Sequence, residues 1–356
     1  MGRVWYTTRE SVMDAFDIKE AAQRSAQVDN AIASACDDVD AWLNRHKVGI
    51  APTDATRYFA WPARNYSLSW RLWLDENELL AVEHIKAAGA AMDPSTYFLE
   101  PVNSGPPYTN VEVNLGTSAS FNNSGTNQRA IEIKGTWGLS DDRSPAGTLQ
   151  EALDASETDV DVSDASLVGV GAVLVVDTER MLVTGRSSIS TGVNLGAALP
   201  AINSARQILG ISGGFHVGET ILVGAERMKI VENDGTNLTV IRAYDGSVLA
   251  EHNIGDGIFA YRTLQVERGA LGTVPASHSQ GTFCETWRVP DLIRDLAQAE
   301  AITRLEQEWS AYGARVFSDE AERDSSGTDV IAGRGLTDIR KACARRYKRK
   351  FRKRAI

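Results

Sequence analysis

The sequence has little cysteine and no long apolar run, and each absence excludes a class of protein. Its three cysteines among 356 residues, Cys36, Cys284 and Cys343, are odd in number and far apart. This spacing fits neither a disulfide framework nor a cysteine metal site, so we expect reduced thiols. No stretch of about 18 apolar residues occurs, so we expect no membrane-spanning helix.

The first residues lack the marks of export or lipid attachment. Met1 leads directly into "GRVWYTTRE", which has no apolar region of a secretory signal. Position 6 is Tyr6, where the myristoylation pattern needs Ser or Thr. We therefore expect neither a secretory signal nor N-terminal myristoylation, and the reduced thiols indicate a cytosolic product.

Catalytic and cofactor motifs are also missing. The five histidines form no H-E-x-x-H or H-x-E pattern, and no C-x-x-C pattern exists, so zinc chemistry lacks ligands. "GVGAVL" lacks the third glycine of a dinucleotide fingerprint, and there is no Walker A motif or G-x-S-x-G elbow. Nothing assembles a nucleophile, a base and an orienting group. We expect no metal, no cofactor and no enzymatic activity.

Amphipathic helices are predicted near both ends of the chain. Thr7 and Glu10 have the spacing of a capping box before "SVMDAFDI". A helix over 26–46 has outward-facing Asp29, Asp37, Asp38 and Asp40 and an apolar face formed by Val28, Ile32, Ala35, Val39 and Trp42. A helix within 289–317 has an apolar stripe of Leu292, Leu296, Ala299, Ile302 and Leu305.

Short strands are predicted between these helices. A period-two pattern covers residues 68–74, where Leu68, Trp70, Leu72 and Leu74 alternate with Ser69, Arg71 and Trp73. Further strands are "LLAVEHIKAAG", "TYFLEP", "NVEVNL" and "RAIEIKGTWG", separated by turn clusters. N-terminal helices, a small antiparallel sheet and a C-terminal helix together indicate the α+β class.

A change of pattern at residues 150–164 predicts an inserted all-β domain. From there to about Trp287, β-branched runs alternate with glycine turns. The predicted organisation is a body over 1–150 plus 285–320, an inserted β domain over 151–284, a flexible connector over 317–336 and a basic amphipathic helix over 337–356.

The predicted β domain contains two overlapping repeats. "VGAVLVVDTERM" (170–181) matches "VGETILVGAERM" (217–228) at an offset of 47, and "VIRAYDGSVLAEHNIGD" (240–256) matches "VERGALGTVPASHSQGT" (266–282) at an offset of 26. The order front, front, back, back predicts a nested insertion of one small barrel or sandwich into another. The outer module would be 170–185 plus 264–282, and the inner one 215–258. Two degenerate tandem copies are the alternative.

Turn residues and repeated polar residues also support two similar hairpin-based modules. Gly224 begins a predicted type II′ turn, and Asp234-Gly235 a predicted type I′ turn. Glu179 and Glu226 recur at hairpin starts, which favours cross-strand pairing with the adjacent Arg180 and Arg227 over acid–base work. His252 and His278 are equivalent, and we expect each histidine side chain to brace the turn after its G-[S/T]-x-x-A motif. Repetition favours a binding or spacing role.

Charge is strongly segregated along the chain. The net charge is −10, yet residues 340–356 carry ten Lys or Arg and no acid. The rest therefore holds 27 basic and 47 acidic groups, a net charge of −20. Such a body repels nucleic acid, whereas its tip attracts phosphates or acidic protein.

The basic tip has a helical pattern. Ile339, Cys343, Tyr347 and Phe351 recur every four residues, which predicts an amphipathic helix. A disordered solubilising tail and a membrane-surface helix are weaker interpretations, and docking into an acidic protein groove or contact with DNA phosphates are the stronger ones. The predicted portal- or DNA-contact residues are Arg340, Lys341, Arg345, Arg346, Tyr347, Lys348, Arg349, Lys350, Phe351, Arg352, Lys353 and Arg354.

The order of these elements resembles a known family. "RVWYTTRESVMDAFDI", "VDNAIASACDDVDAWL", "TRYFAWP", "LLAVEHIKAAG", "DPSTYFLEP" and "IEIKGTWG" follow one another over residues 3–140 as in the head-to-tail adaptor (connector) proteins of long-tailed bacteriophages. The helix near 289–316 resembles that family more loosely. The β insertion resembles modules found in phage neck and tail proteins.

The resemblance implies a structural virion protein made in the host bacterial cytoplasm and located in the neck, at the portal vertex. Such adaptors form rings, usually dodecamers, that extend the DNA channel between portal and tail, and their C-terminal segments reach the portal protein. Implied partners are further copies of the chain, the portal, a tail-side neck or terminator protein, and the genomic DNA in the bore. The inserted domain makes this chain larger than a minimal adaptor, and we expect it to project outward, toward capsid or tail.

Two other functions compete with this interpretation. A nucleic-acid-binding protein would use the basic tip, with binding that falls steeply with salt. A carbohydrate- or receptor-binding protein would use the repeats, but residues 160–260 hold only Phe215, Tyr244 and Phe259 as aromatics.

Overall fold

The computed structural model has the α+β fold predicted from the sequence. Helices account for 22% and strands for 36% of the chain, and the strands are antiparallel, so the fold class is confirmed. The structure describes residues 3–15, 22–45, 49–61, 70–123, 125–202, 206–211, 213–309 and 334–349. The predicted connector at 317–336 lies almost wholly outside these ranges.

The chain divides into two compact units. The first comprises Met1–Val39, Arg143–Ala270 and Val274–Arg346, and the second Asp40–Asp142, Leu271–Thr273 and Tyr347–Ile356. The structure thus groups the N-terminal helices with the β region rather than with residues 40–142. Hydrogen bonds explain the grouping, because the Arg9 amide donates to the Val170 carbonyl (3.1 Å) and the Val170 amide donates to the Glu10 carboxylate (2.8 Å).

Helix α1 (Arg9–Ala15) begins one residue later than the predicted capping box. The hydroxyl of Thr8, not that of Thr7, accepts the hydrogen bond from the Ser11 amide (3.2 Å). The Glu10 carboxylate is bonded to Val170, so it does not reach back to cap the helix. The predicted capping box is wrong because a tertiary contact recruits its acidic member.

Helix α2 (Ala22–Trp42) has the predicted apolar face, except at its end. Four of the five predicted face residues are buried or nearly so, but the Trp42 side chain is 44% exposed and Leu43 is buried instead. The predicted outward aspartates form ion pairs, since Asp29 binds Arg9 (2.5 Å) and Asp38 binds Arg304.

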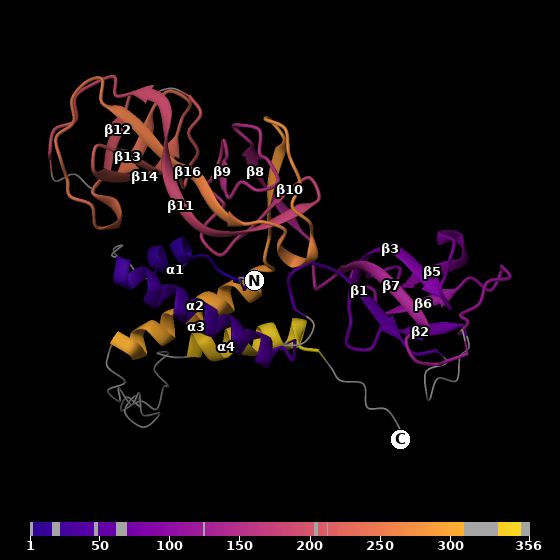
Figure 1. The fold of residues 1–356 in the computed structure, drawn as a ribbon. Coiled ribbons are helices and arrows are strands. Elements are labelled where there is room, and N and C mark those ends of the chain that lie inside the picture. Colours follow the sequence, from indigo (N-terminus) through magenta and orange to yellow (C-terminus); the bar gives the residue numbers. More distant parts are fainter. Residues whose placement is uncertain are drawn as a thin grey trace, which may run out of the picture. The chain divides into compact units, whose positions relative to one another are not determined.

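Helices α3 (Asp291–Trp309) and α4 (Arg334–Tyr347) complete the helical part (Figure 1). Leu296 and Leu305 of the predicted α3 stripe are buried, but the stripe is rotated from the prediction. Its other buried members are Ile293, Ala297, Glu300 and Ala301. The predicted stripe missed the true buried face because that face includes Glu300, and hydrophobic periodicity treats every charged residue as outward-facing.

The second unit contains two antiparallel sheets around one core. The first has the order β1 (Thr53–Phe59), β7 (Ile131–Trp137), β3 (Leu79–Ala87), β4 (Ala90–Ala91), and the second β2 (Arg71–Trp73), β6 (Asn110–Val113), β5 (Tyr97–Glu100). Strands β3, β5, β6 and β7 match the predicted segments. Trp137, Ile131 and Leu72 are nearly inaccessible and belong to the shared core.

The inserted β region begins at Arg143 and forms one ten-stranded antiparallel sheet (Figure 1). Its strands are β8 (Arg143–Thr148), β9 (Asp159–Asp161), β10 (Val173–Val176), β11 (Glu179–Asn194), β12 (Arg206–Leu209), β13 (Thr220–Val223), β14 (Glu226–Asn233), β15 (Leu238–Ile241), β16 (Gly257–Glu267) and β17 (Phe283–Trp287). The order is β12-β15-β14-β13-β16-β11-β10-β17-β8, and β9 pairs with β16. The region therefore starts eight residues before the predicted boundary.

Two hydrophobic cores divide this region, and we name the two modules after them. The outer module has a core from 146–183 and 264–284, including Leu174, Met181 and Leu264. The inner module has a core from 195–260, including Ile221, Met228 and Val240. The long strands β11 and β16 pair along their lengths and pass through both modules.

Hairpin geometry follows one turn prediction and departs from the other. Val223 pairs with Glu226 across a two-residue turn whose first residue, Gly224, has φ of +59°, which fits the predicted type II′ turn. The predicted two-residue Asp-Gly turn is wrong, because Asn233 pairs with Leu238 across four residues. The Asp234 carboxylate there accepts amides from within the loop, which stabilises the longer turn.

Candidate functional site

The basic helix α4 lies against α3 through one of the predicted contact residues. The Arg340 guanidinium donates to both carboxylate oxygens of Glu300 (2.5 and 2.7 Å), and Glu300 is only 3% exposed. The hydrogen bond to Glu300 raises the pKa of Arg340. Arg340 therefore anchors the helix within the protein, whereas the sequence placed it in an external contact.

The rest of α4 has the amphipathic character that the sequence predicted. Cys343 is fully buried, while Lys341, Arg345 and Arg346 are exposed. Arg345 and Arg346 stand in the last turn, where cations interact favourably with the helix dipole. The helix presents a cationic face to solvent and buries the opposite face.

The helix ends at Tyr347, where the chain enters the second unit and forms hydrogen bonds within it. The Arg45 guanidinium donates to the Tyr347 carbonyl (3.0 Å), and the Arg349 amide donates to the Leu43 carbonyl (3.0 Å). Arg349 is largely buried and also donates to the Asp75 carbonyl (3.2 Å). These bonds replace helical ones, so α4 stops short of the predicted helix over 337–356.

The predicted contact residues thus fall into three groups. Arg340, Tyr347 and Arg349 are bound within the chain, Tyr347 through its carbonyl. Lys348, just after the helix, is exposed, with its ammonium 5.9 Å from the Trp42 ring centre. The exposed helical cations are Lys341, Arg345 and Arg346. The remaining predicted residues, Lys350, Phe351, Arg352, Lys353 and Arg354, lie outside the described ranges.

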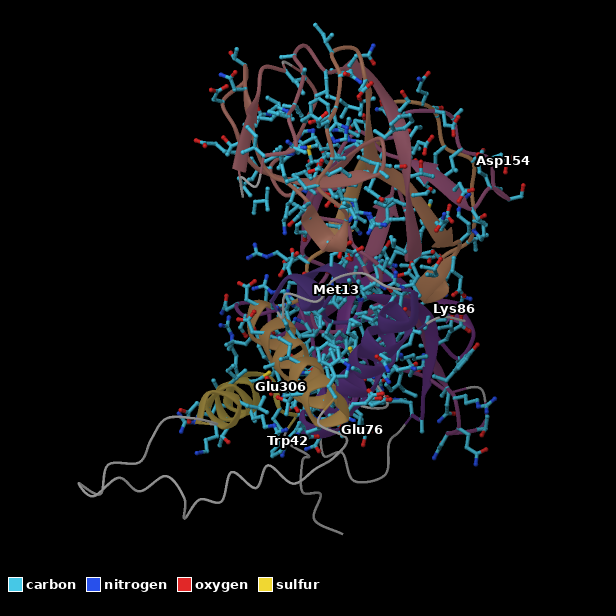
Figure 2. All side chains as sticks on the ribbon, turned by 90° about the vertical axis from the view of Figure 1, so that its left-hand side faces the viewer. Met13, Trp42, Glu76, Lys86, Asp154 and Glu306 are labelled. Atoms are coloured by element: carbon cyan, nitrogen blue, oxygen red, sulfur yellow. The ribbon has the colours of Figure 1, made fainter. Side chains whose placement is uncertain are left out.

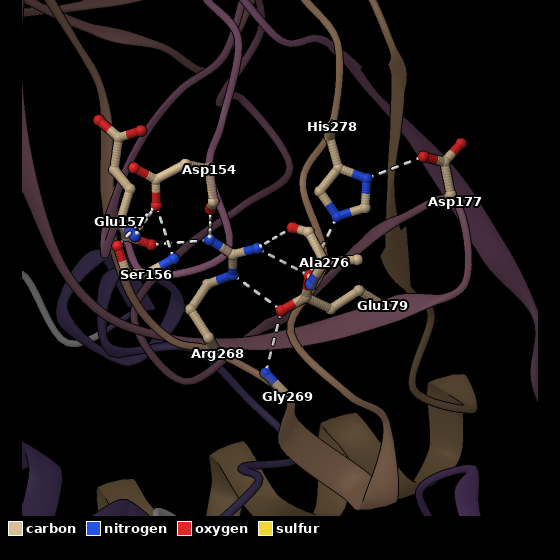
Figure 3. Close-up of polar contacts among 9 residues, drawn as sticks. All are labelled: Asp154, Ser156, Glu157, Asp177, Glu179, Arg268, Gly269, Ala276 and His278. Carbon is tan, nitrogen blue, oxygen red and sulfur yellow. Dashed lines mark hydrogen bonds and ion pairs between the residues drawn. The ribbon is translucent and has the colours of Figure 1, made fainter.

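The outer module contains a buried polar cluster built on Glu179 (Figure 3). Arg268 donates to both carboxylate oxygens (2.8 Å each), and the amides of Gly269 and Ala276 donate at 3.0 Å. His278 Nε2 lies 3.0 Å from the same carboxylate, and its Nδ1 lies 2.8 Å from Asp177. The cluster fixes the loop between Arg268 and His278.

The inner module repeats this cluster around Glu226. Arg242 donates to both carboxylate oxygens (3.0 and 2.7 Å), and the amides of Ala243 and Ala250 donate at 2.9 and 3.2 Å. His252 Nε2 lies 2.8 Å from the carboxylate. Each module therefore holds one Glu–Arg–His trio with the same contacts.

The hydrogen bonds keep both glutamates ionised. Burial is the largest single effect and acts to raise the pKa of Glu179, but donors led by Arg268 and His278 lower it to about 2. Burial likewise acts to raise the pKa of Glu226, and donors led by Arg242 lower it to about 2. Carboxylates held in this way stabilise a fold and are poor proton acceptors at neutral pH.

The structure corrects the predicted partners of these glutamates. Neither glutamate pairs with the adjacent arginine; Arg227, for example, binds Asp245 (2.7 Å) and the Tyr261 hydroxyl (2.9 Å). The true partners come from the second repeat, at the offset of 26. The shared recurrence of Glu, Arg and His was the signal that could have found the trio.

Besides their side-chain contacts, both histidines form backbone pairs that the sequence did not predict. The backbone of His278 exchanges two hydrogen bonds with Leu153, and that of His252 exchanges two with Leu199. These equivalent bridges extend the similarity of the modules to segments that the sequence comparison left out.

Metal and membrane sites receive no support from the described part of the chain. There, no group of three or more His, Cys, Asp or Glu side chains is placed to hold a metal ion. None of the helices in the same ranges is long and apolar enough to cross a bilayer.

Comparison with known proteins gives no relative for this chain. No protein-family model, no curated protein and no solved structure matches it.

Proposed function

We propose that the chain is a head-to-tail adaptor of a long-tailed bacteriophage, a structural component of the virion neck. The order of sequence elements over residues 3–140 supports this role. The observation that carries it is the exposed cationic face of α4, with Lys341, Arg345 and Arg346, on a chain whose residues 1–339 have a net charge of −20. Opposite charges on separate regions suit separate partners.

The anchored side of α4 supports a docking role for its exposed side. Arg340 and Cys343 fix the helix to the protein, so little side-chain or helix ordering remains to oppose binding. A preformed basic helix fits an acidic groove, and the proposed occupant of that role is the portal protein. Copies in a ring, expected to be dodecameric, would present many such helices at once.

The acidic body fits the other part of an adaptor's task. A negative channel wall repels the phosphates of passing DNA and keeps the duplex from binding tightly. The β region would project from the ring toward capsid or tail-side neck proteins. Its two Glu–Arg–His trios hold loops rigidly, which favours a structural role over catalysis.

A charge reversal tests the portal contact. In the double variant Lys341→Glu with Arg345→Glu, we expect binding to the portal of the same particle to weaken more than tenfold at physiological salt, measured by interferometry with immobilised portal. The matched control, Arg129→Glu with Lys134→Glu, makes the same charge change at exposed sites of the second unit. Equal portal binding by wild type and the α4 variant would contradict the proposal.

A nucleic-acid-binding protein is the second candidate, since the same cationic face would attract phosphates. It predicts that duplex DNA binds the isolated protein and that log affinity falls linearly with log salt concentration. The α4 variant would then lose DNA binding while the control retains it. Portal binding without DNA binding would favour the adaptor role.

A further inference from the structure

Three arginines from distant parts of the sequence donate hydrogen bonds to one turn of the second unit, residues 74–78. We call Arg45, Arg57 and Arg349 the arginine cluster. Arg45 follows α2, Arg57 lies on β1, and Arg349 follows α4. Glu76, labelled in Figure 2, belongs to the same turn and is exposed. The fold thus brings together positive charges that the sequence keeps apart.

A single buried acid of the turn holds two members of the arginine cluster. Arg45 donates to both carboxylate oxygens of Glu78 (2.5 and 3.3 Å). Arg349 donates to the Asp75 carbonyl (3.2 Å), while its Nε lies 3.6 Å from the Glu78 carboxylate. The closer, two-point contact with Arg45 uses most of the Glu78 charge, so Arg349 is only partly neutralised.

Arg57 has no acidic partner in the described part of the chain. Its Nη1 donates to the Asn77 side-chain oxygen, and its guanidinium carbon lies 4.6 Å from the Trp137 ring centre. Burial lowers the pKa of Arg57, and the charge of Arg349 lowers it further. A partly buried charge is normally paired, because it has lost solvation by water and needs a counter-charge in return. The environment of Arg57 therefore favours an added anion.

The arginine cluster has donors that a ligand can reach. The Nε and Nη2 of Arg57 and the Nη1 of Arg349 have no hydrogen-bond partner within the described protein. None of these three nitrogens is fully buried. The Trp137 ring and the Asn77 oxygen fix the plane of the Arg57 guanidinium, and the Asp75 carbonyl fixes Arg349. The donors are thus ordered before a ligand arrives, which lowers the entropic cost of binding.

The excess positive charge suits a phosphate dianion better than a carboxylate. Arg57 is unpaired, and Arg349 shares an acid that Arg45 already neutralises. Glu76 also acts on Arg349, but it is exposed and forms no ion pair with a described residue, so solvent screens its charge. Guanidinium groups present N–H donors in a fixed fork that matches the oxygens of phosphate. A phosphate dianion also brings two negative charges, whereas a carboxylate brings one.

We propose that Arg57 and Arg349 bind a phosphate group beside the turn at residues 74–78. Arg57 donates to it through Nε and Nη2, and Arg349 through Nη1, while Arg45 keeps the Glu78 carboxylate engaged. The phosphate is either a free anion or part of a DNA backbone, and the experiment separates these two sources. The site is independent of the portal contact, because neither arginine belongs to α4.

The test measures anion binding to the full chain at mildly alkaline pH, where a phosphate group is mainly a dianion. Calorimetry follows inorganic phosphate binding to wild type and to Arg57→Gln, with acetate at equal ionic strength as the carboxylate probe. We expect wild type to bind phosphate more tightly than acetate, and Arg57→Gln to weaken phosphate binding about tenfold. Arg129→Gln, at an exposed arginine of the same unit, is the matched control and should bind phosphate as wild type does.

Thermal unfolding separates a binding role of Arg57 from a structural one. Because this arginine has no counter-ion, we expect Arg57→Gln to keep nearly the Tm of wild type when phosphate is absent. Phosphate should raise the Tm of wild type by mass action and should raise that of Arg57→Gln much less. Arg57→Lys keeps the charge but loses the fork, so its phosphate affinity should be intermediate. This variant carries the test if Arg57→Gln does not fold.

A short labelled DNA duplex identifies the source of the phosphate, with fluorescence anisotropy as the measurement. Weaker DNA binding by Arg57→Gln than by wild type assigns the site to backbone phosphates, and equal DNA binding assigns it to a free anion. Both outcomes agree with a phosphate site. The proposal is overturned if inorganic phosphate neither binds wild type nor raises its Tm, if acetate binds as tightly as phosphate, or if the Arg57 variants bind phosphate as wild type does.

Discussion

The outer and inner modules contain the same trio, but the chain closes it over very different distances. In the inner module Arg242 and His252 follow Glu226 by 16 and 26 residues. In the outer module 89 and 99 residues separate Glu179 from Arg268 and His278, because the inner module lies between them. The same contacts are local in one module and non-local in the other.

This difference predicts that the inner trio forms before the outer one and that one module depends on the other for its stability. Closing a longer loop costs more conformational entropy, and contacts distant in sequence form more slowly. The inner trio can form as soon as its own hairpins exist. The outer trio closes at a lower entropic cost once the folded inner module has brought the two halves of the outer module together. We therefore expect the outer module to depend on the inner one, and not the reverse.

The largest expected effect comes from removing the charge of each buried glutamate. Glu226→Gln and Glu179→Gln each leave a buried arginine without its counter-ion, which costs roughly 3 to 5 kcal/mol. Glu226→Gln should increase hydrogen exchange in both modules, whereas Glu179→Gln should increase it in the outer module alone. Hydrogen-exchange mass spectrometry measures both.

Glu232→Gln serves as the control for this pair, because Glu232 is an exposed residue of the same strand as Glu226. We expect it to leave exchange unchanged in both modules. Equal loss of protection in both modules from either buried substitution would break the proposed dependence of the outer module on the inner one.

Acid should destabilise both modules over the same pH range. The pKa of each glutamate falls from an ordinary 4.5 to about 2 on folding, so the unfolded chain takes up protons first as pH decreases. The resulting stabilisation is fully present above pH 4.5 and is lost as pH falls toward 2, by roughly 3 kcal/mol for each carboxylate. Urea unfolding at a series of pH values should show it. In Glu226→Gln, the free energy of unfolding should fall by about half as much between pH 4.5 and pH 2 as it does in wild type. An equal fall in the two proteins would contradict the assignment of this stabilisation to Glu179 and Glu226.

The comparison also shows how far sequence reasoning reached. Hydrophobic patterns with periods of about 2 and about 3.6 residues placed most of the strands and helices, because backbone geometry alone sets those periods. The repeats identified Glu179, Glu226 and their histidines as equivalent. The reasoning failed at the choice of partner, since it assigned each glutamate to its neighbour in sequence. Partner choice depends on which strands meet in space, and the hydrophobic pattern does not encode that. The recurrence of Arg together with Glu and His in both repeats was the signal that could have identified the partners.

The inability of sequence patterns to identify ion-pair partners also explains why the predictions for α3 and α4 differ from the structure. Glu300 is buried on α3 because Arg340, forty residues later, neutralises it there. From sequence, Arg340 is one cation among ten in the tip, and nothing local separates it from Lys341 or Arg345. The apolar period of the tip correctly placed Cys343 inside, because burial of an apolar face needs no particular partner. Ion pairs do need one.

The smallest effect concerns a side-chain contact of the histidine that the modules do not share. Asp177 binds His278 in the outer module, and its inner equivalent is Gly224, so His252 has a single carboxylate partner. Asp177 is 60% exposed, and we expect Asp177→Asn to lower stability by only about 0.5 to 1 kcal/mol. Guanidinium unfolding of the variant checks this value.

The reciprocal change would give the inner module the contact it lacks. A side chain at Gly224 would meet the His252 ring at 3.7 Å, an ordinary contact, and Asp177 shows that aspartate adopts positive φ at this turn position. Gly224→Asp should therefore gain a hydrogen bond but lose part of that gain to backbone strain. Comparing it with Gly224→Asn cancels the strain and isolates the charge. The aspartate variant should be more stable by about 0.5 kcal/mol in low salt and by less in high salt. If Gly224→Asp and Gly224→Asn are equally stable in low salt, a carboxylate at this turn position does not stabilise the histidine, and the contact of Asp177 with His278 does not account for a difference in stability between the modules.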